Sequence, residues 1–161
     1  MNIGKKRWKY FAFFVVVIGL LAISILTMYN VNQRHYSILT DPSELLDIAK
    51  KDLMSDIIID LRDKNDYEVA HIGKTINIPF VDGSEIDDYL IKNNSKSKTV
   101  YLFCYSGNRA AVAFNYLTEK GYKSLVYVNF GYEEFCERTN NTFIPATGPC
   151  DCLADEIKIL L

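Results

Sequence analysis

Cysteine is scarce in this chain of 161 residues, which contains only Cys104, Cys136, Cys150 and Cys152. Four cysteines are too few for disulfides to scaffold a fold of this length. No C-x-x-C pair is repeated, which argues against a structural zinc ribbon. We therefore expect neither a metal nor an organic cofactor.

Excess positive charge is also missing. The net charge is −2, and four of the 18 Lys and Arg residues lie within the first nine positions. The remainder holds 14 basic and 20 acidic residues, a net charge of −6. A domain with this balance has no electrostatic reason to bind nucleic acid or an anionic membrane surface, so we expect neither partner for it.

Charge is absent altogether from residues 10–28, YFAFFVVVIGLLAISILTM. A helix of this length rises roughly 30 Å, the thickness of a bilayer's hydrocarbon core. The pattern predicts a basic cytoplasmic segment at 1–9, a transmembrane helix at 10–29, and the rest of the chain on the extracytoplasmic, periplasmic side of the cell membrane. A cleaved signal peptide is an alternative, although its apolar run is usually ~7–15 residues. A buried core helix is a third, which the absence of a polar face disfavours.

Beyond a polar tether predicted at 30–40, short apolar runs alternate with helical patterns. Asp41-Pro42-Ser43-Glu44 is typical of a helix start, with Asp41 as the cap and Pro42 in the first turn. This alternation predicts an α/β domain over 41–140, with a parallel sheet and helices on both faces, followed by a tail at 141–161. The expected strands are 56–60, 75–79, 98–103 and 124–128, and the later helices are 84–91 (capped by Ser84), 109–120 (ended by Gly121) and 132–138.

Cys104 lies at the carboxyl end of a predicted strand, where ligands bind in sheets of this kind. The segment Cys104-Tyr-Ser-Gly-Asn-Arg109 joins that strand to a helix. Gly107 permits a tight loop, and loop amides, the helix N-terminus and the charge of Arg109 would all favour a thiolate. An inert core cysteine is the alternative that this spacing disfavours.

Several segments in order resemble the rhodanese-like domain family, over roughly 100 residues. These segments are Asp60-Leu-Arg62, Tyr67-Glu-Val-Ala-His71-Ile72, Ile76-Asn-Ile-Pro79, Cys104 to Arg109 as C-x-x-G-x-R, and Asn129-Phe-Gly131-Tyr132. The chain departs from the family pattern at Ala70, at Gly73 to Thr75 and at Phe130, all outside the Cys104 loop.

The resemblance implies a sulfurtransferase in which Cys104 carries sulfur as a persulfide. The donor would be thiosulfate or another persulfide, and the acceptor a thiol, a partner protein or cyanide. Asp60 and Arg62 would brace the Cys104 loop and not react, and the favoured alternative is that they form only a structural ion pair. The loop residues implied to bind substrate are Tyr105, Ser106, Gly107, Asn108 and Arg109. Tyr105 and Asn108 stand where cationic residues are frequent in the family, which weakens the case for thiosulfate.

The sequence also leaves several alternative hypotheses open. Phosphatases of similar fold place five residues between Cys and Arg, whereas this chain has four. The domain could instead be a non-catalytic sulfur carrier or binding module. Cys150 and Cys152 could form a redox pair that resolves the persulfide, or one of them could form a structural bridge to Cys136. His71 could act as an acid or base, but a hydrogen bond to the backbone is the favoured role.

Overall fold

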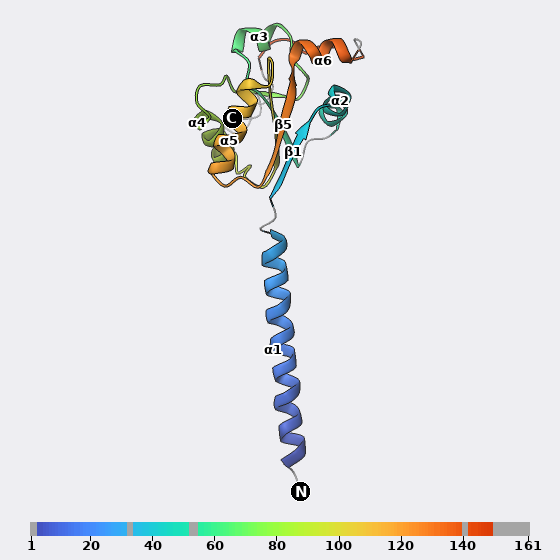
Figure 1. Ribbon diagram of the computed structural model, residues 1–161, viewed down its shortest axis with the longest axis vertical. Coiled ribbons are helices and arrows are strands. Elements are labelled where there is room, and N and C mark those ends of the chain that lie inside the picture. Colours follow the sequence, from blue (N-terminus) through green and yellow to red (C-terminus); the bar gives the residue numbers. More distant parts are fainter. Residues whose placement is uncertain (1–2, 32–33, 52–54, 140–141, 150–161) are drawn as a thin grey trace, which may run out of the picture. The chain divides into compact units, whose positions relative to one another are not determined.

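The computed structural model describes residues 3–31, 34–51, 55–139 and 142–149 and divides the chain into two units, 1–33 and 34–161. The first unit contains helix α1, Ile3–Val31, which includes the helix predicted at 10–29 (Figure 1). Within the described residues, no helix combines the length and apolar character that crossing a membrane requires. The helix is thus confirmed, but its predicted role as a transmembrane anchor is not supported.

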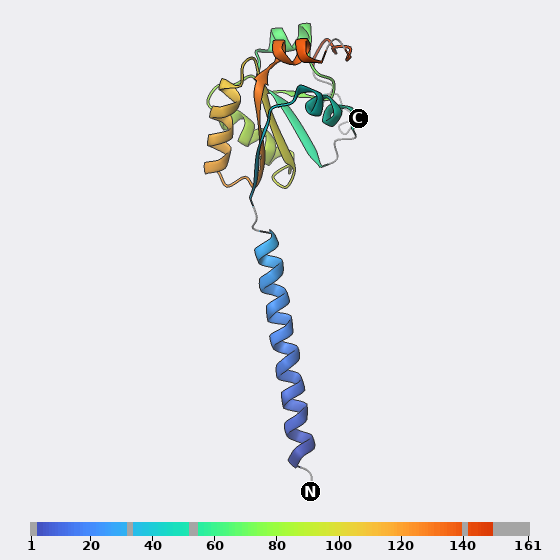
Figure 2. The same ribbon diagram turned by 45° about the vertical axis from the view of Figure 1, so that its right-hand side comes forward.

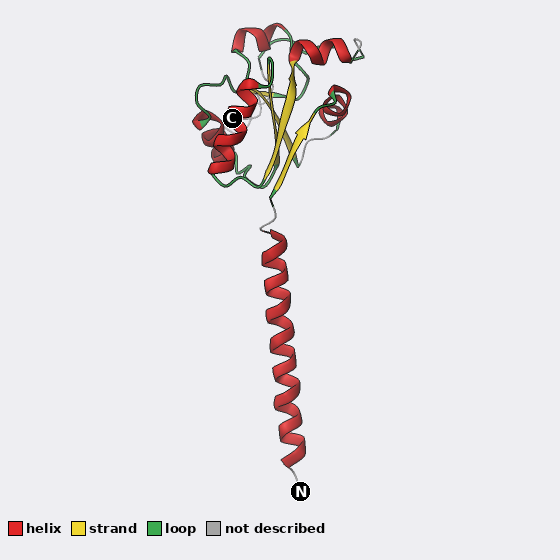
Figure 3. Cartoon of the chain, in the orientation of Figure 1, coloured by secondary structure: helices red, strands yellow, loops and turns green. Residues whose placement is uncertain are grey.

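The second unit is built on a five-stranded parallel sheet in the order β1-β5-β4-β2-β3. Figure 3 shows the strands of this unit in yellow and its helices in red. This arrangement confirms the predicted parallel sheet. Strand β4 lies in the middle, so its last residue, Cys104, lies at the centre of the carboxyl edge. The strands are β1 His35–Leu39, β2 Asp56–Asp60, β3 Ile76–Asn77, β4 Thr99–Cys104 and β5 Ser124–Gly131.

Helices cover both faces of this sheet, as predicted. Helices α4 and α5 pack on one face, and helices α2 and α6 pack on the other (Figure 2). A short further helix, α3, follows strand β2. The helices of this unit are α2 Pro42–Lys50, α3 Lys64–Val69, α4 Ser84–Lys92, α5 Asn108–Glu119 and α6 Tyr132–Arg138.

Strand β2 shows why a continuous apolar run marks a strand of this sheet. Ile57 and Ile59 belong to the core on the α4 and α5 face, whereas Ile58 belongs to the core on the other face. Successive side chains of a strand point to opposite faces, and here both faces are covered. Full burial of such a side chain contributes about 1.5–3 kcal/mol, so each of these positions requires an apolar residue.

The helix boundaries follow local signals, with one correction. The Asp41 carboxylate accepts a hydrogen bond from the Ser43 amide at 3.0 Å, and Pro42 opens helix α2, both as predicted. Gly121 follows helix α5 with φ of +85°, also as predicted. The prediction that Ser84 caps helix α4 is wrong. Gly83 holds that position, and Ser84 is the first helical residue.

The predicted tether at 30–40 is wrong over its second half. Residues 35–39 form strand β1, which pairs in parallel with β5 and extends the folded domain beyond the predicted 41–140. The strand escaped prediction because it lies at the sheet edge, where most of its side chains are exposed and no apolar run is needed. Strand β5 continues past the predicted 124–128, and β3 is shorter than the predicted 75–79.

The described part of the predicted tail, residues 142–149, is paired to the domain. His71 and Ala146 exchange two backbone hydrogen bonds of 2.9 Å. The ring of Phe143 packs edge-on against Phe135 of helix α6, with centroids 4.9 Å apart. Residues 142–149 are therefore fastened to the segment around His71.

Candidate active site

The Cys104 loop runs from the end of strand β4 to the start of helix α5 at Asn108. Cys104 is only 1% exposed and shares a core with Leu61, Leu102 and Ala110. Tyr105, Ser106 and Asn108, by contrast, are exposed, and Arg109 is partly exposed. The thiol thus lies at the base of a loop whose outer residues face solvent.

Gly107 shapes this loop as the sequence predicts. Its φ of +85° lies in the left-handed region that favours glycine, and it is the residue that precedes helix α5. A Cβ at this position would also lie 2.9 Å from the Tyr127 hydroxyl. The convergence of loop amides on the Cys104 sulfur stays a prediction.

Gly131 packs directly against the same loop, a role that sequence reasoning missed. Strand β5 pairs Gly131 with Cys104 after an irregularity in register. A Cβ at position 131 would overlap the Tyr105 carbonyl group. The only signal for this role was the Gly131-Tyr132 pair, and nothing local to it points to position 105.

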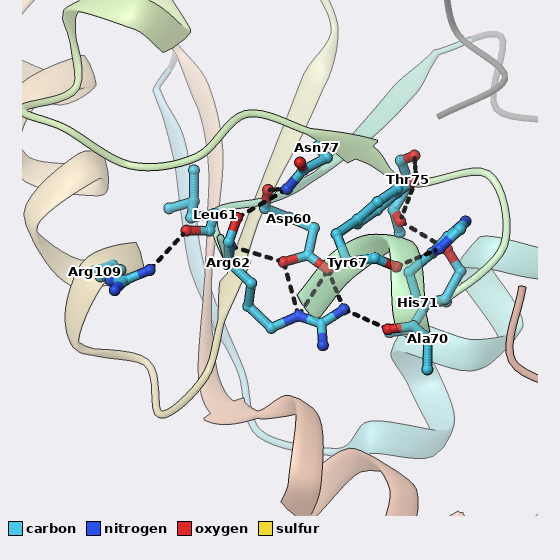
Figure 4. Close-up of polar contacts among 10 residues, drawn as sticks. Asp60, Leu61, Arg62, Tyr67, Ala70, His71, Thr75, Asn77 and Arg109 are labelled. Atoms are coloured by element: carbon cyan, nitrogen blue, oxygen red, sulfur yellow. Dashed lines mark hydrogen bonds and ion pairs between the residues drawn. The ribbon is translucent and has the colours of Figure 1, made fainter. Parts of the chain in front are cut away.

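The Asp60 carboxylate and the Arg62 guanidinium form a buried ion pair at the end of strand β2 (Figure 4). Arg62 Nη2 lies 2.8 Å from Asp60 Oδ2, and Nε lies 3.0–3.1 Å from the two carboxylate oxygens. The Arg62 side chain is 3% exposed and the Asp60 side chain is 0% exposed. This geometry confirms the expected structural ion pair.

Arg62 also interacts with three other groups, of which only Tyr105 belongs to the Cys104 loop. Its Nη2 donates a hydrogen bond of 2.8 Å to the Ala70 carbonyl. The guanidinium lies 3.8 Å from the centroid of the Tyr132 ring and 5.9 Å from that of Tyr105. Burial is the main cause that raises the pKa of Tyr132 to about 12, and the neighbouring Cys136 is the second cause. The Tyr132 hydroxyl stays protonated at neutral pH.

Asn77 holds the turn after strand β2, which sequence reasoning also missed. Its amide nitrogen donates to the carbonyl oxygens of Asp60 at 3.0 Å and Arg62 at 2.9 Å (Figure 4). Leu61, between them, donates its amide to the Phe103 carbonyl at 2.8 Å. The Asn77 bonds tie the two residues of the ion pair to strand β3, and the Leu61 bond ties the turn to strand β4, which carries Cys104.

Arg109 interacts with two residues of the segment that follows strand β2. Its Nη1 lies 3.2 Å from Asp63 Oδ1 and 3.3 Å from the Leu61 carbonyl oxygen, to which it donates a hydrogen bond. Its guanidinium also lies 5.4 Å from the centroid of the Tyr105 ring. Sequence reasoning assigned no role to Asp63, although this residue directly follows the Asp60-Leu-Arg62 segment.

His71 adopts the favoured structural role. It is 5% exposed, its Nδ1 lies 2.8 Å from the Tyr67 carbonyl oxygen, and its ring stacks on Tyr67 at 3.8 Å (Figure 4). A carbonyl oxygen only accepts, so Nδ1 donates in this bond. The imidazole is therefore engaged with its own segment of backbone.

The remaining cysteines add no described partner to the site. Cys136 is partly buried on helix α6, whereas its predicted partners Cys150 and Cys152 lie outside the described residues. Over the described ranges, no cluster of three or more His, Cys, Asp or Glu side chains is arranged to hold a metal ion.

The family model of the rhodanese-like domain matches residues 41–138 of this chain. The chain belongs to this family. It is 28% identical over 86 residues to the thiosulfate sulfurtransferase GlpE of Coxiella burnetii, which covers 53% of this chain and 74% of that protein. It is 33% identical over 82 residues to the adenylyltransferase and sulfurtransferase UBA4 of Debaryomyces hansenii, covering 48% of this chain. That match spans only 16% of the UBA4 length.

A solved structure shows the same fold. The single-domain sulfurtransferase RDL2 of Saccharomyces cerevisiae superposes with a TM-score of 0.54 at 15% identity, covering 68% of this chain and 95% of that one. At this identity the likeness concerns the fold alone.

Proposed function

We propose that the rhodanese-like domain is a sulfurtransferase that carries sulfur as a persulfide on Cys104. The observation that carries this proposal is the position of Cys104. A nearly buried thiol ends the central strand at the carboxyl edge of a parallel sheet, and a glycine-shaped loop leads from it into helix α5. Ligands bind at this edge in parallel sheets.

The first half-reaction loads the cysteine. The Cys104 thiolate attacks the outer sulfur of the donor, a new S–S bond forms, and the donor's S–S bond breaks. The leaving group takes the bonding electron pair, as sulfite from thiosulfate or as a thiolate from a persulfide. The N-terminus of helix α5 and the loop amides would stabilise the negative charge on the sulfur.

The second half-reaction returns the free thiolate. An acceptor thiolate, or cyanide, attacks the outer sulfur of the Cys104 persulfide, and Cys104 leaves with the electron pair of the broken bond. Arg62, Asp60 and Asn77 take no part in these bond changes. They hold the turn after β2 against the Cys104 loop.

Intact mass spectrometry of the full-length chain tests this proposal. After incubation with thiosulfate or with glutathione persulfide, the wild type should gain one sulfur atom, which dithiothreitol removes. Cys104→Ser should gain none, whereas the control Cys136→Ser should behave as the wild type. If a folded wild-type protein with reduced thiols gains no sulfur from either donor, the proposal is wrong.

A turnover assay separates an enzyme from a carrier. Multiple thiocyanate molecules per protein from cyanide, or repeated persulfide transfer to a small thiol, support enzymatic sulfur transfer. A single loaded sulfur that small acceptors do not remove supports the alternative carrier, which would need a specific partner protein.

The location of the domain is a proposal that rests on the sequence alone. The charge-free residues 10–28 and the four preceding cations favour attachment to the cell membrane with the domain outside the cytoplasm. Carbonate extraction of membranes, followed by protease treatment of intact spheroplasts, tests both points. Release by carbonate would contradict the attachment, and protection from protease would contradict the orientation.

A further inference from the structure

Both arginines beside the Cys104 loop have a carboxylate partner. Arg62 pairs with Asp60, and Arg109 pairs with Asp63 at 3.2 Å. The first pair is buried and multiply bonded, so its charges are balanced permanently. The second pair is partly exposed, with side chains 37% and 61% accessible, and is therefore the one that a substitution can uncouple without disturbing the core.

The orientation of Asp63 is unusual for its place in the chain. Asp63 occupies the N-cap position of helix α3, where an aspartate side chain commonly accepts a hydrogen bond from the first helical amides. Its side chain makes no such bond and contacts Arg109 instead. The carboxylate thus acts on a residue 46 positions away and not on its own helix.

We propose that Asp63 is a specificity-determining residue that directs Cys104 toward persulfide donors and away from thiosulfate. This inference rests on the proposed sulfur transfer at Cys104. Thiosulfate is a dianion, and its reaction with a thiolate gathers three negative charges. Because Asp60 and Asp63 offset the charges of Arg62 and Arg109, these two arginines give a dianion little net attraction.

A persulfide places fewer charges near the reacting sulfur. When its outer sulfur is protonated, the donor is neutral there, and transfer gives a Cys104 persulfide and a donor thiolate with atoms and charge conserved. The Tyr105 ring, 39% exposed and lying beside Arg109, offers the carbon chain of such a donor an apolar contact. A persulfide therefore depends less on a free guanidinium than thiosulfate does.

Steady-state sulfur transfer to cyanide with each donor tests the proposal. Asp63→Asn should raise kcat/KM for thiosulfate about two- to fivefold, the range expected when one exposed opposing charge is removed. The value for glutathione persulfide should change less than about twofold. Asparagine is as good an N-cap as aspartate, so helix α3 should be retained.

Asp66→Asn is the matched control. It alters the net charge equally on the same helix, but no ion pair joins Asp66 to Arg109. It should leave the ratio of the two donors unchanged. In a double-mutant cycle, Arg109→Gln should abolish the gain that Asp63→Asn gives with thiosulfate. The gain should also shrink as ionic strength rises.

The outcomes separate this inference from the proposed function. If the wild type loads sulfur on Cys104 but Asp63→Asn leaves thiosulfate use unchanged, or raises both donors equally, the role of Asp63 is wrong and sulfur transfer stands. An equal gain in Asp66→Asn would assign the effect to net charge and would also overturn it. If neither donor loads any variant, the proposed function itself fails.

Discussion

Cys104 and Gly131 are neighbours across strands β4 and β5, and the backbone that follows Cys104 lies against the bare Cα of Gly131. The position of the candidate nucleophile therefore depends on a residue 27 positions later in the chain. Any side chain at position 131 would occupy the space of the Tyr105 carbonyl group.

Gly131→Ala should displace the Cys104 loop. Because the contact is with backbone and not with a flexible side chain, we expect a loss of about 1–3 kcal/mol in the free energy of unfolding. Sulfur loading of Cys104 should fall about tenfold or more. Denaturant unfolding and intact mass measure the two effects. Gly73→Ala, at a site with no atom within 4 Å of the new Cβ, is the control and should change neither.

Asp60→Ala should be among the most destabilising single changes in the domain. It leaves the Arg62 guanidinium buried without its counter-ion, a loss that typically costs about 3–5 kcal/mol. Chemical denaturation measures this cost. Lys64→Ala, which breaks the exposed pair with Glu68, should cost less than about 1 kcal/mol. Similar effects of the two substitutions would contradict the structural importance of the buried pair.

His71→Gln should lower stability without changing the chemistry. The imidazole donates to the Tyr67 carbonyl and stacks on the Tyr67 ring, so we expect a loss of about 1–3 kcal/mol. The pH profile of sulfur loading should keep its shape because His71 is engaged with its own backbone segment. A profile that loses a titration step in the variant would instead support the acid–base hypothesis for this residue.

Alkaline pH should destabilise the domain in part through Tyr122. Burial and a hydrogen bond of 2.6 Å to the Asp87 carboxylate raise the pKa of Tyr122 above its ordinary value. In the unfolded chain the phenol ionises near its ordinary pKa of about 10, whereas in the folded protein it stays neutral. Its contribution is therefore complete below about pH 10 and is lost as the pH rises further.

Denaturant unfolding at about pH 9 to 11 measures this dependence. Tyr122→Phe should lower stability at pH 9 because Asp87 loses its partner, and it should make the decline toward pH 11 shallower. An equally steep decline in the variant would assign the alkaline sensitivity to other tyrosines, such as Tyr132.

Much of the framework was predictable because its signals are local. The buried strands β2 and β4 need continuous apolar runs, and helix α2 begins at Asp41 with a proline in its first turn. The segment from Cys104 to Arg109 is contiguous, so its spacing alone predicted the loop and the role of Gly107 in shaping it. Strand β1 and helix α3 escaped because neither needs an apolar run.

The sequence by itself thus determined the parallel α/β fold, the position of Cys104 at the end of a strand and the family to which the domain belongs. Only the tertiary structure decided which groups meet around that cysteine. Arg109 pairs with Asp63 and Gly131 contacts the Tyr105 backbone because strand order and register bring distant segments to one edge of the sheet. No local pattern encodes such contacts, since each depends on how several strands are placed at once.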